Sequence, residues 1–241
     1  EEAVKQVAKL TVLPRGINHA FAPIDEPVNA LRERMTGGSI FLNDSFVFLN
    51  AYPNTLTSRL DVTMEAFAIF AKDKPNVRLW LHTNGDGHIN IFDLAERLNI
   101  GDKLGVHTSG KDFPDEPDEE MNLLYNACDA GLNSSMGESW GNFNVLHASV
   151  GKPQIVPAHS ACSELFERCG IMVPISAKFT FDDSMAIGSL ISPQNMAKEM
   201  DKLYKGKATY KKLAAASLKK FGTERYKWIS IAKVWKKILT E

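Results

Sequence analysis

Short apolar runs alternate with segments of helical periodicity through the middle of this chain, and that order constrains its fold more than any other feature. The runs expected to form strands are residues 45–50, 77–83, 103–108, 130–135, 153–158 and 171–175. The segments expected to form helices lie between them, at residues 59–73, 92–99, 119–129, 143–150 and 162–170. Because parallel strands joined by helices are buried on both faces, this order predicts an α/β, doubly wound parallel sheet.

The C-terminal part of the chain predicts three more helices and carries a strong positive charge. The first two of these segments end at Gly206 and Gly222, which are typical helix stops. From Lys198 to Glu241 there are 13 lysines and arginines against 4 acidic residues, whereas the rest of the chain has 15 against 25. Such a basic tail is either simply solvated or makes a weak contact with an anionic membrane surface. Trp228 and Trp235 are expected on its packed side.

Composition limits the class of protein. Of the 241 residues, 44% are hydrophobic and 24% are charged, which is typical of a globular domain. Cys128, Cys162 and Cys169 form no Cys-x-x-Cys pair, so we expect free thiols in a reducing, cytoplasmic compartment and no zinc site. The acidic, proline-containing segment 110–120 is expected to be a solvated loop. The first residue is Glu, and we expect the chain to be part of a longer protein.

A glycine-containing turn at residues 136–141 joins a predicted strand to the helix at 143–150. Ligands of doubly wound sheets bind at such turns, beyond the carboxyl ends of the strands. The backbone N–H groups of Gly141, Asn142 and Phe143 would point outward with the positive end of the helix dipole behind them, which suits a phosphate group. Asn142 is equally explained as an ordinary helix cap.

Around this turn the chain resembles the C-terminal domain of retaining GT-B glycosyltransferases of family 4. Glu138-Ser139-Trp140-Gly141 and Gly151-Lys152-Pro153 keep the frame of that family's signature. Further similar segments are PRGINHAFAP (14–23), LYNACDAGLNSS (124–135), SACSEL (160–165) and KWISIAKVWKKIL (227–239). The sequences of these motifs are most similar to versions encoded by large DNA viruses of algae.

The resemblance implies a Rossmann-like half of a GT-B fold that binds a nucleoside-diphosphate sugar. The implied units are residues 1–38, a linker and the end of a preceding domain; 39–192, the nucleotide-sugar-binding domain; and 193–241, a helical tail packed on it. Glu138 would hold the sugar, and the turn formed by Ser139, Trp140, Gly141, Asn142 and Phe143 would hold the donor phosphate. No metal or other cofactor and no nucleic-acid partner are expected. The acceptor, a glycan or another molecule, would bind with the missing N-terminal domain of the same protein.

The sequence departs from the family's pattern where a second glutamate would hold the ribose. Leu146 stands at that position and cannot accept a hydrogen bond. The neighbouring His147 would take this role if the helix were shifted by one residue. Otherwise His147 is a core or surface histidine and the ribose is held in another way.

Two other places could contribute to the donor site. Arg59 corresponds to one of a pair of cations that the family places against the diphosphate, but Thr57 and Ser58 precede it where the second cation would stand. A guanidinium suits a bidentate phosphate contact, although a solvated arginine at a helix start is the alternative. His107 and Thr108 end a predicted strand and could line the base pocket, or serve a structural role.

These observations predict a retaining glycosyltransferase with Glu138 and Arg59 as its catalytic residues in this chain. The opposing hypothesis is a non-catalytic module of the same fold that binds nucleotide sugars or docks on a membrane. Leu146 and the absent second cation favour the module, whereas Glu138, Arg59 and the glycine-containing turn favour the enzyme.

Overall fold

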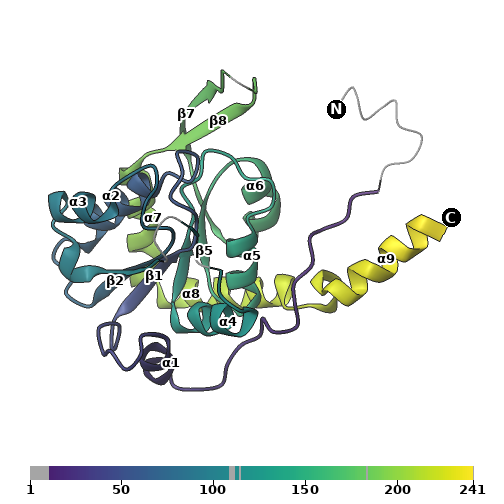
Figure 1. The fold of residues 1–241 in the computed structure, drawn as a ribbon, viewed down its shortest axis with the longest axis horizontal. Helices are drawn as coiled ribbons and strands as arrows, with labels where there is room; N and C mark the ends of the chain where they lie inside the picture. Colours follow the sequence, from purple (N-terminus) through teal and green to yellow (C-terminus); the bar gives the residue numbers. More distant parts are fainter. Residues whose placement is uncertain (1–10, 109–111, 114, 183, 241) are drawn as a thin grey trace.

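A computed structural model of the chain describes residues 11–108, 112–113, 115–182 and 184–240 (Figure 1). Its centre is a six-stranded sheet in the order β3-β2-β1-β4-β5-β6, in which every neighbouring pair is parallel. The strands are β1 (Phe46–Asn50), β2 (Val77–His82), β3 (Leu104–His107), β4 (Ala130–Leu132), β5 (Gln154–Pro157) and β6 (Ile171–Val173). The predicted doubly wound parallel sheet is therefore confirmed.

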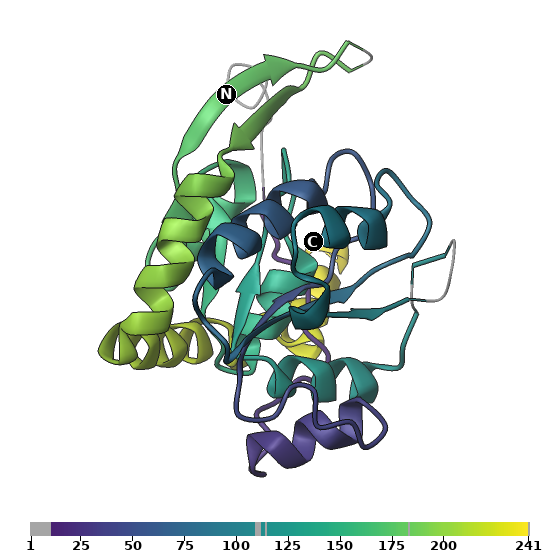
Figure 2. The same ribbon diagram turned by 90° about the vertical axis from the view of Figure 1, so that its left-hand side faces the viewer.

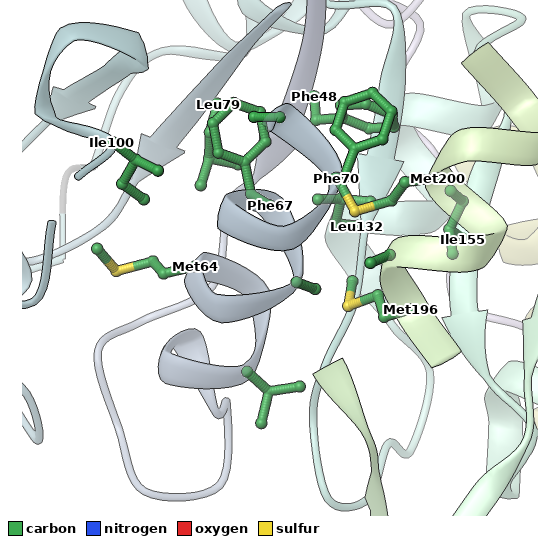
Figure 3. Close-up of a cluster of buried hydrophobic side chains, with 14 of the residues drawn as sticks. Phe48, Met64, Phe67, Phe70, Leu79, Ile100, Leu132, Ile155, Met196 and Met200 are labelled. Atoms are coloured by element: carbon green, nitrogen blue, oxygen red, sulfur yellow. The ribbon is translucent and has the colours of Figure 1, made fainter. Parts of the chain in front are cut away.

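Helices cover both faces of the sheet because strand side chains alternate between two apolar clusters. Phe48 points into one cluster, whereas its neighbours Val47 and Leu49 point into the other. The first cluster is covered by α2 (Leu60–Ala71), α3 (Ile91–Arg97) and α7 (Pro193–Lys205) (Figure 3). The second lies beneath α4 (Asp118–Ala127), α5 (Asn142–Ser149) and α6 (Ser160–Phe166). Helix α8 (Lys207–Phe221) contributes Phe221 to the second cluster.

A two-stranded antiparallel hairpin follows the sheet, and the prediction that the last strand ends at residue 175 is wrong. Its strands are β7 (Ile175–Thr180) and β8 (Ile187–Ile191), and it projects from the body of the fold (Figures 1 and 2). Most of β7 is exposed, so it lacks the continuous apolar run typical of a buried strand. In the middle of β8 the N–H of Ser189 donates to the carbonyl oxygen of Met136 at 2.8 Å.

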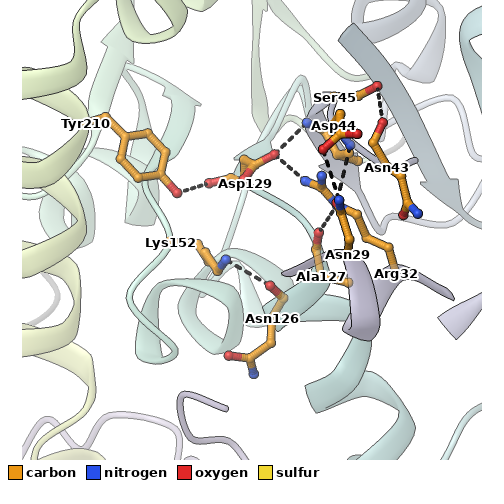
Figure 4. A network of polar contacts seen from close by, with 11 residues as sticks. Asn29, Arg32, Asn43, Asp44, Ser45, Asn126, Ala127, Asp129, Lys152 and Tyr210 are labelled. Carbon is orange, nitrogen blue, oxygen red and sulfur yellow. Dashed lines mark hydrogen bonds and ion pairs between the residues drawn. The ribbon is translucent and has the colours of Figure 1, made fainter. Parts of the chain in front are cut away.

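The segment expected to be a linker contains helix α1 (Val28–Met35), which packs against α4. Arg32 is 2% exposed; its Nη2 lies 2.7 Å from Asp129 Oδ2 and its Nε donates to the carbonyl oxygen of Ala127 at 3.0 Å. The contact between Arg32 and Asp129 is drawn in Figure 4. Asp129 also accepts from the N–H of Val47 on β1 at 2.7 Å. These bonds attach α1 to the sheet through the buried Arg32 and the half-buried Asp129.

The last helix, α9 (Trp228–Thr240), extends away from the sheet (Figure 1). Trp228 and Trp235 are 48% and 49% exposed, so the prediction that both lie on a packed side is wrong. The helix meets the rest of the described chain near its first turns, where Ile231 is buried and Gly16 lies against the Trp228 ring. Among the described residues, no helix has the length and apolar character needed to cross a membrane.

Two further predictions concern termini and loops. Residues 1–10, expected to end a preceding domain, lie outside the described residues, as do residues 110, 111 and 114 of the predicted loop. Within that predicted loop, helix α4 already begins at Asp118. The three cysteines are buried and free, as predicted.

Candidate functional site

A cavity of about 370 Å³ lies beyond the carboxyl ends of β1 and β4. These two strands are neighbours, and the chain leaves them toward opposite edges of the sheet, which makes this the topological switch point. The loop after β1 contributes Tyr52 to the cavity wall, and the segment after β4 contributes Glu138. The remaining wall comes from α4 and α5, including Tyr125, Phe143 and Leu146, and from Phe21 and the segment before α4, which includes Glu116.

Glu138 lies at this cavity with both carboxylate oxygens engaged. Its Oε1 accepts from the backbone N–H groups of Ser139 and Trp140 at 3.1 and 3.3 Å, and its Oε2 lies 2.9 Å from Tyr52 Oη. The backbone N–H of Glu138 donates to Ser160 Oγ at 3.1 Å, which fixes the turn against α6. A carboxylate has about four acceptor positions, so Glu138 retains room on Oε2 for one further donor.

Tyr52 is the centre of a polar network that the sequence did not reveal. Its hydroxyl lies 2.8 Å from Asn144 Oδ1 and accepts from Asn133 Nδ2 at 2.9 Å. Asn133 Nδ2 also donates to Asn144 Oδ1, so that oxygen is satisfied and the single Tyr52 proton is available to Glu138. Burial and the Glu138 carboxylate raise the pKa of Tyr52 well above its ordinary value, so the hydroxyl keeps its proton.

The N-terminus of α5 opens into the same cavity. Gly141 is the N-cap residue, with φ of 74°, and no side chain caps the helix, so Asn142 does not act as a cap. Asn142 and Phe143 both line the cavity, and within the described part of the chain their backbone N–H groups have no hydrogen-bond partner. The backbone N–H groups of Ser139 and Trp140 instead donate to the Glu138 carboxylate. Two outward N–H groups at the positive end of a helix dipole form a site for an anion.

Arg59 begins α2 on the other side of the switch point and is held by an acidic neighbour. Its Nη2 lies 2.7 Å from Asp61 Oδ2 and its Nε lies 2.9 Å from Asp61 Oδ1, a bidentate pair that raises the pKa of Arg59. Its backbone adopts the left-handed region, with φ of 51°, and its carbonyl oxygen accepts from Ser134 Oγ at 2.7 Å. Arg59 is placed beside the loop after β4, but its guanidinium faces Asp61 and is not part of the cavity wall.

The structure places Leu146 and His147 on different sides of α5. Leu146 lines the cavity, whereas His147 is completely buried between the Tyr125 and Phe143 rings, at 5.5 and 5.8 Å between centroids. Burial lowers the pKa of His147 to about 3, so the ring is neutral. Consecutive helix positions differ by about 100° in direction, and this rotation turns His147 toward the sheet. The suggestion that His147 holds a ligand is therefore wrong, and the core alternative is correct.

His107 lies at the end of β3, beside a second and smaller cavity of about 100 Å³. Its Nε2 is 2.8 Å from Glu116 Oε1, and its ring stacks on His82 with 5.0 Å between centroids. Thr108 follows as an exposed residue. The smaller cavity shares Glu116 and Met121 with the switch-point cavity, so His107 borders the same region of the molecule. Among the residues the structure describes, no three or more His, Cys, Asp or Glu side chains are arranged to hold a metal ion.

Comparison with known proteins shows similarity in three-dimensional structure. No protein-family model and no curated protein sequence matches the chain. Among solved structures, a glycosyltransferase from Rickettsia africae superimposes with a TM-score of 0.72 at 17% identity, over 96% of this chain and 57% of that one. HepE from Anabaena, in complex with UDP and glucose, gives 0.70 at 16% identity, over 93% and 55%. The fold is that of one half of a GT-B glycosyltransferase.

The extent of the match agrees with a single domain. The chain spans a little over half the length of the Rickettsia and Anabaena proteins. By contrast, it covers all of the C-terminal domain of a group 1 glycosyl transferase, LpcC from Francisella tularensis, with a TM-score of 0.65 at 14% identity and 88% of this chain matched. At these identities the comparison concerns the fold.

Proposed function

We propose that this chain is the donor-binding domain of a retaining glycosyltransferase of family 4, which transfers a sugar from a nucleoside-diphosphate sugar to a glycan or another acceptor. One observation carries the proposal: the Glu138 carboxylate and the free N–H groups of Asn142 and Phe143 share one cavity at the switch point of the sheet. A carboxylate suits sugar hydroxyls, and a helix N-terminus suits a phosphate.

In this proposal the protein stabilises the charge that develops on the leaving diphosphate. Fixed N–H groups that meet this charge act more strongly on the transition state than on the ground state, and therefore accelerate the reaction. Arg59 supplies a further positive charge if its guanidinium exchanges Asp61 for the diphosphate. No metal ion is required for these contacts. The acceptor-binding site and the second domain of the cleft would belong to another part of the same protein.

Affinity measurements on variants test the division of roles at the donor site. Because Glu138 is proposed to touch the sugar, Glu138→Gln should weaken a nucleotide sugar by roughly 1–3 kcal/mol and leave the bare nucleoside diphosphate unchanged. Arg59→Ala should weaken both ligands together, since both contain the diphosphate. Calorimetry with UDP, GDP and their glucose conjugates, with and without EDTA, measures these effects.

A matched control is Glu167→Gln, which removes the same charge from an exposed position at the C-terminal end of α6. It should change neither affinity. Equal losses of nucleotide sugar and diphosphate in Glu138→Gln would contradict the sugar contact, and binding that requires a divalent ion would contradict the metal-free site.

The non-catalytic module remains the second candidate, because Leu146 lines the cavity and the Arg59 guanidinium is paired with Asp61. Slow hydrolysis of a bound nucleotide sugar by the isolated chain, abolished by Glu138→Gln, would support the enzyme. Tight binding without any hydrolysis by the chain joined to its second domain would support the module.

A weak contact with an anionic membrane surface is a separate proposal. Trp228, Trp235 and Leu239 are exposed on α9, which also carries Lys233 and Lys236. Exposed aromatic and aliphatic side chains with neighbouring lysines are typical of helices that lie at such a surface. Sedimentation with vesicles that contain phosphatidylserine, compared with neutral vesicles, tests this contact.

A further inference from the structure

The wall of the switch-point cavity leaves part of a bound nucleotide without a hydrogen-bond partner. On α5, Phe143 and Leu146 line the cavity, and on α4 the lining residues Met121 and Tyr125 face them. A ribose diol placed against side chains that are mostly apolar would lose its hydrogen bonds to water and form few with the protein. This loss would weaken binding. This inference rests on the proposed function, because it asks how the nucleotide of that same site is held.

Glu116 stands where the two cavities of this region meet. The larger cavity contains Glu138 and the N-terminus of α5, while the smaller one is lined by aromatic and imidazole rings that include Trp80, His82 and His107. Glu116 and Met121 line both. A ribose joins the base to the diphosphate, so a nucleotide with its phosphate at α5 and its base at the rings would place its ribose at this junction.

The Glu116 carboxylate is held in place but still has free acceptor positions. Its Oε1 lies 2.8 Å from His107 Nε2, and the His107 ring is itself stacked on His82. The edge of Phe113 in turn meets the His82 ring, at 5.4 Å between centroids. Within the described residues no other hydrogen bond involves the Glu116 side chain, which leaves about three of its acceptor positions for a ligand.

We propose that Glu116, positioned by His107, accepts hydrogen bonds from the ribose hydroxyls of a nucleoside diphosphate, in place of a carboxylate at position 146. A carboxylate accepts two vicinal hydroxyls at once, which makes it selective for a ribonucleotide over a 2′-deoxynucleotide. Asp115 and Asp118 are the competing carboxylates in the larger cavity, and neither lines the smaller cavity. Asp115 is exposed, and Oδ2 of Asp118 accepts from Asn18 Nδ2 at 2.5 Å.

The test compares ribonucleotides with 2′-deoxynucleotides by calorimetry, using UDP, GDP and their 2′-deoxy forms. The unmodified chain should prefer the ribonucleotide by roughly tenfold or more, the scale of a hydrogen bond to a charged group. Glu116→Gln should lose most of this preference, because the ribonucleotide is weakened relative to the deoxynucleotide. His107→Phe should lower the same preference, because Glu116 is then no longer held.

Two control variants separate the hydrogen bond from the general effect of charge. Glu119→Gln removes an exposed charge from the start of α4, and Asp118→Asn removes one of the two competing carboxylates. Removing a negative charge near a diphosphate should by itself tighten binding. A lower affinity of Glu116→Gln for the ribonucleotide would therefore have the opposite sign to this general effect of charge. Both controls should keep the preference for the ribonucleotide.

The outcomes distinguish this inference from the proposed function. If the unmodified chain binds the ribonucleotide and the 2′-deoxynucleotide equally, the Glu116 contact is refuted and the donor site stands. The same holds if Glu116→Gln keeps the preference for the ribonucleotide. If Asp118→Asn abolishes the preference, the ribose contact belongs to Asp118 and the assignment to Glu116 is also refuted. If neither UDP nor GDP binds the unmodified chain, the donor site itself is refuted together with the contact.

Discussion

Removal of the Tyr52 hydroxyl is the most direct test of the polar network behind Glu138. In Tyr52→Phe the ring keeps its edge contact with Phe143, at 5.5 Å between centroids, so packing should be preserved. The hydroxyl's contacts with Glu138, Asn144 and Asn133 are lost. A hydrogen bond to a charged group contributes roughly 1.5–3 kcal/mol. Part of this is recovered, because Asn133 and Asn144 remain bonded to each other at 2.9 Å.

The expected loss in the free energy of unfolding is therefore about 1–2 kcal/mol, which lowers the melting temperature by roughly 2–8 °C for a chain of this size. Urea unfolding and calorimetric melting measure it. The matched control is Tyr125→Phe, since the Tyr125 hydroxyl has no hydrogen bond to another described residue while its ring lines the same cavity. If the two variants lose the same stability, the Tyr52 hydroxyl does not hold Glu138 and the argument from the network is refuted.

Three further predictions test other parts of the structure. Asp61→Asn should free the Arg59 guanidinium and tighten the nucleoside diphosphate by roughly twofold to fivefold, the scale of a partly exposed ion pair, as measured by calorimetry; an unchanged affinity would argue against a phosphate role for Arg59. The pKa of His147 falls from 6.5 to about 3 on folding, so the unfolded chain binds the extra proton and stability should fall as the pH drops below 6.5. Urea titrations should show a slope of up to about 1.4 kcal/mol per pH unit from this residue, and His147→Gln should remove it. Arg32→Leu leaves Asp129 without its buried partner and should cost about 3 kcal/mol in urea unfolding, whereas Arg34→Leu, which removes an exposed pair with Glu26, should cost less than about 1 kcal/mol.

The sheet and its covering helices could be predicted because their periodicities are local and strong. Each buried strand is a short apolar run, and each helix repeats apolar residues at helical spacing. The hairpin and α1 could not be found in this way. Strand β7 is largely exposed, and α1 is stabilised by Arg32, whose partner Asp129 is 97 residues away. Contacts of that range depend on the tertiary fold.

The candidate site also has a part that local sequence predicts and a part that depends on long-range contacts. Glu138 and the start of α5 belong to one continuous turn, so local sequence was sufficient to propose them. Tyr52 and Glu116 come from other segments, and the order of the strands brings them to the cavity. The direction of His147 depends on how α5 is rotated against the sheet, which its own sequence does not determine, since both Leu146 and His147 are compatible with a buried helix face.

The seam between β1 and β4 has a mechanical consequence for ligand binding. Two residue pairs join these strands, Phe48 with Ala130 and Leu49 with Gly131, whereas β1 and β2 share five. Beyond the strands, the same seam is crossed by the bond between Tyr52 and Glu138 and by the Met136 N–H, which donates to the carbonyl oxygen of Thr57 at 2.9 Å. Loops on both sides of this seam line the cavity, so a bound ligand would contact both and hold the two halves of the sheet together. Binding should then slow amide exchange in β4 and β1 together, including at positions that no ligand atom reaches.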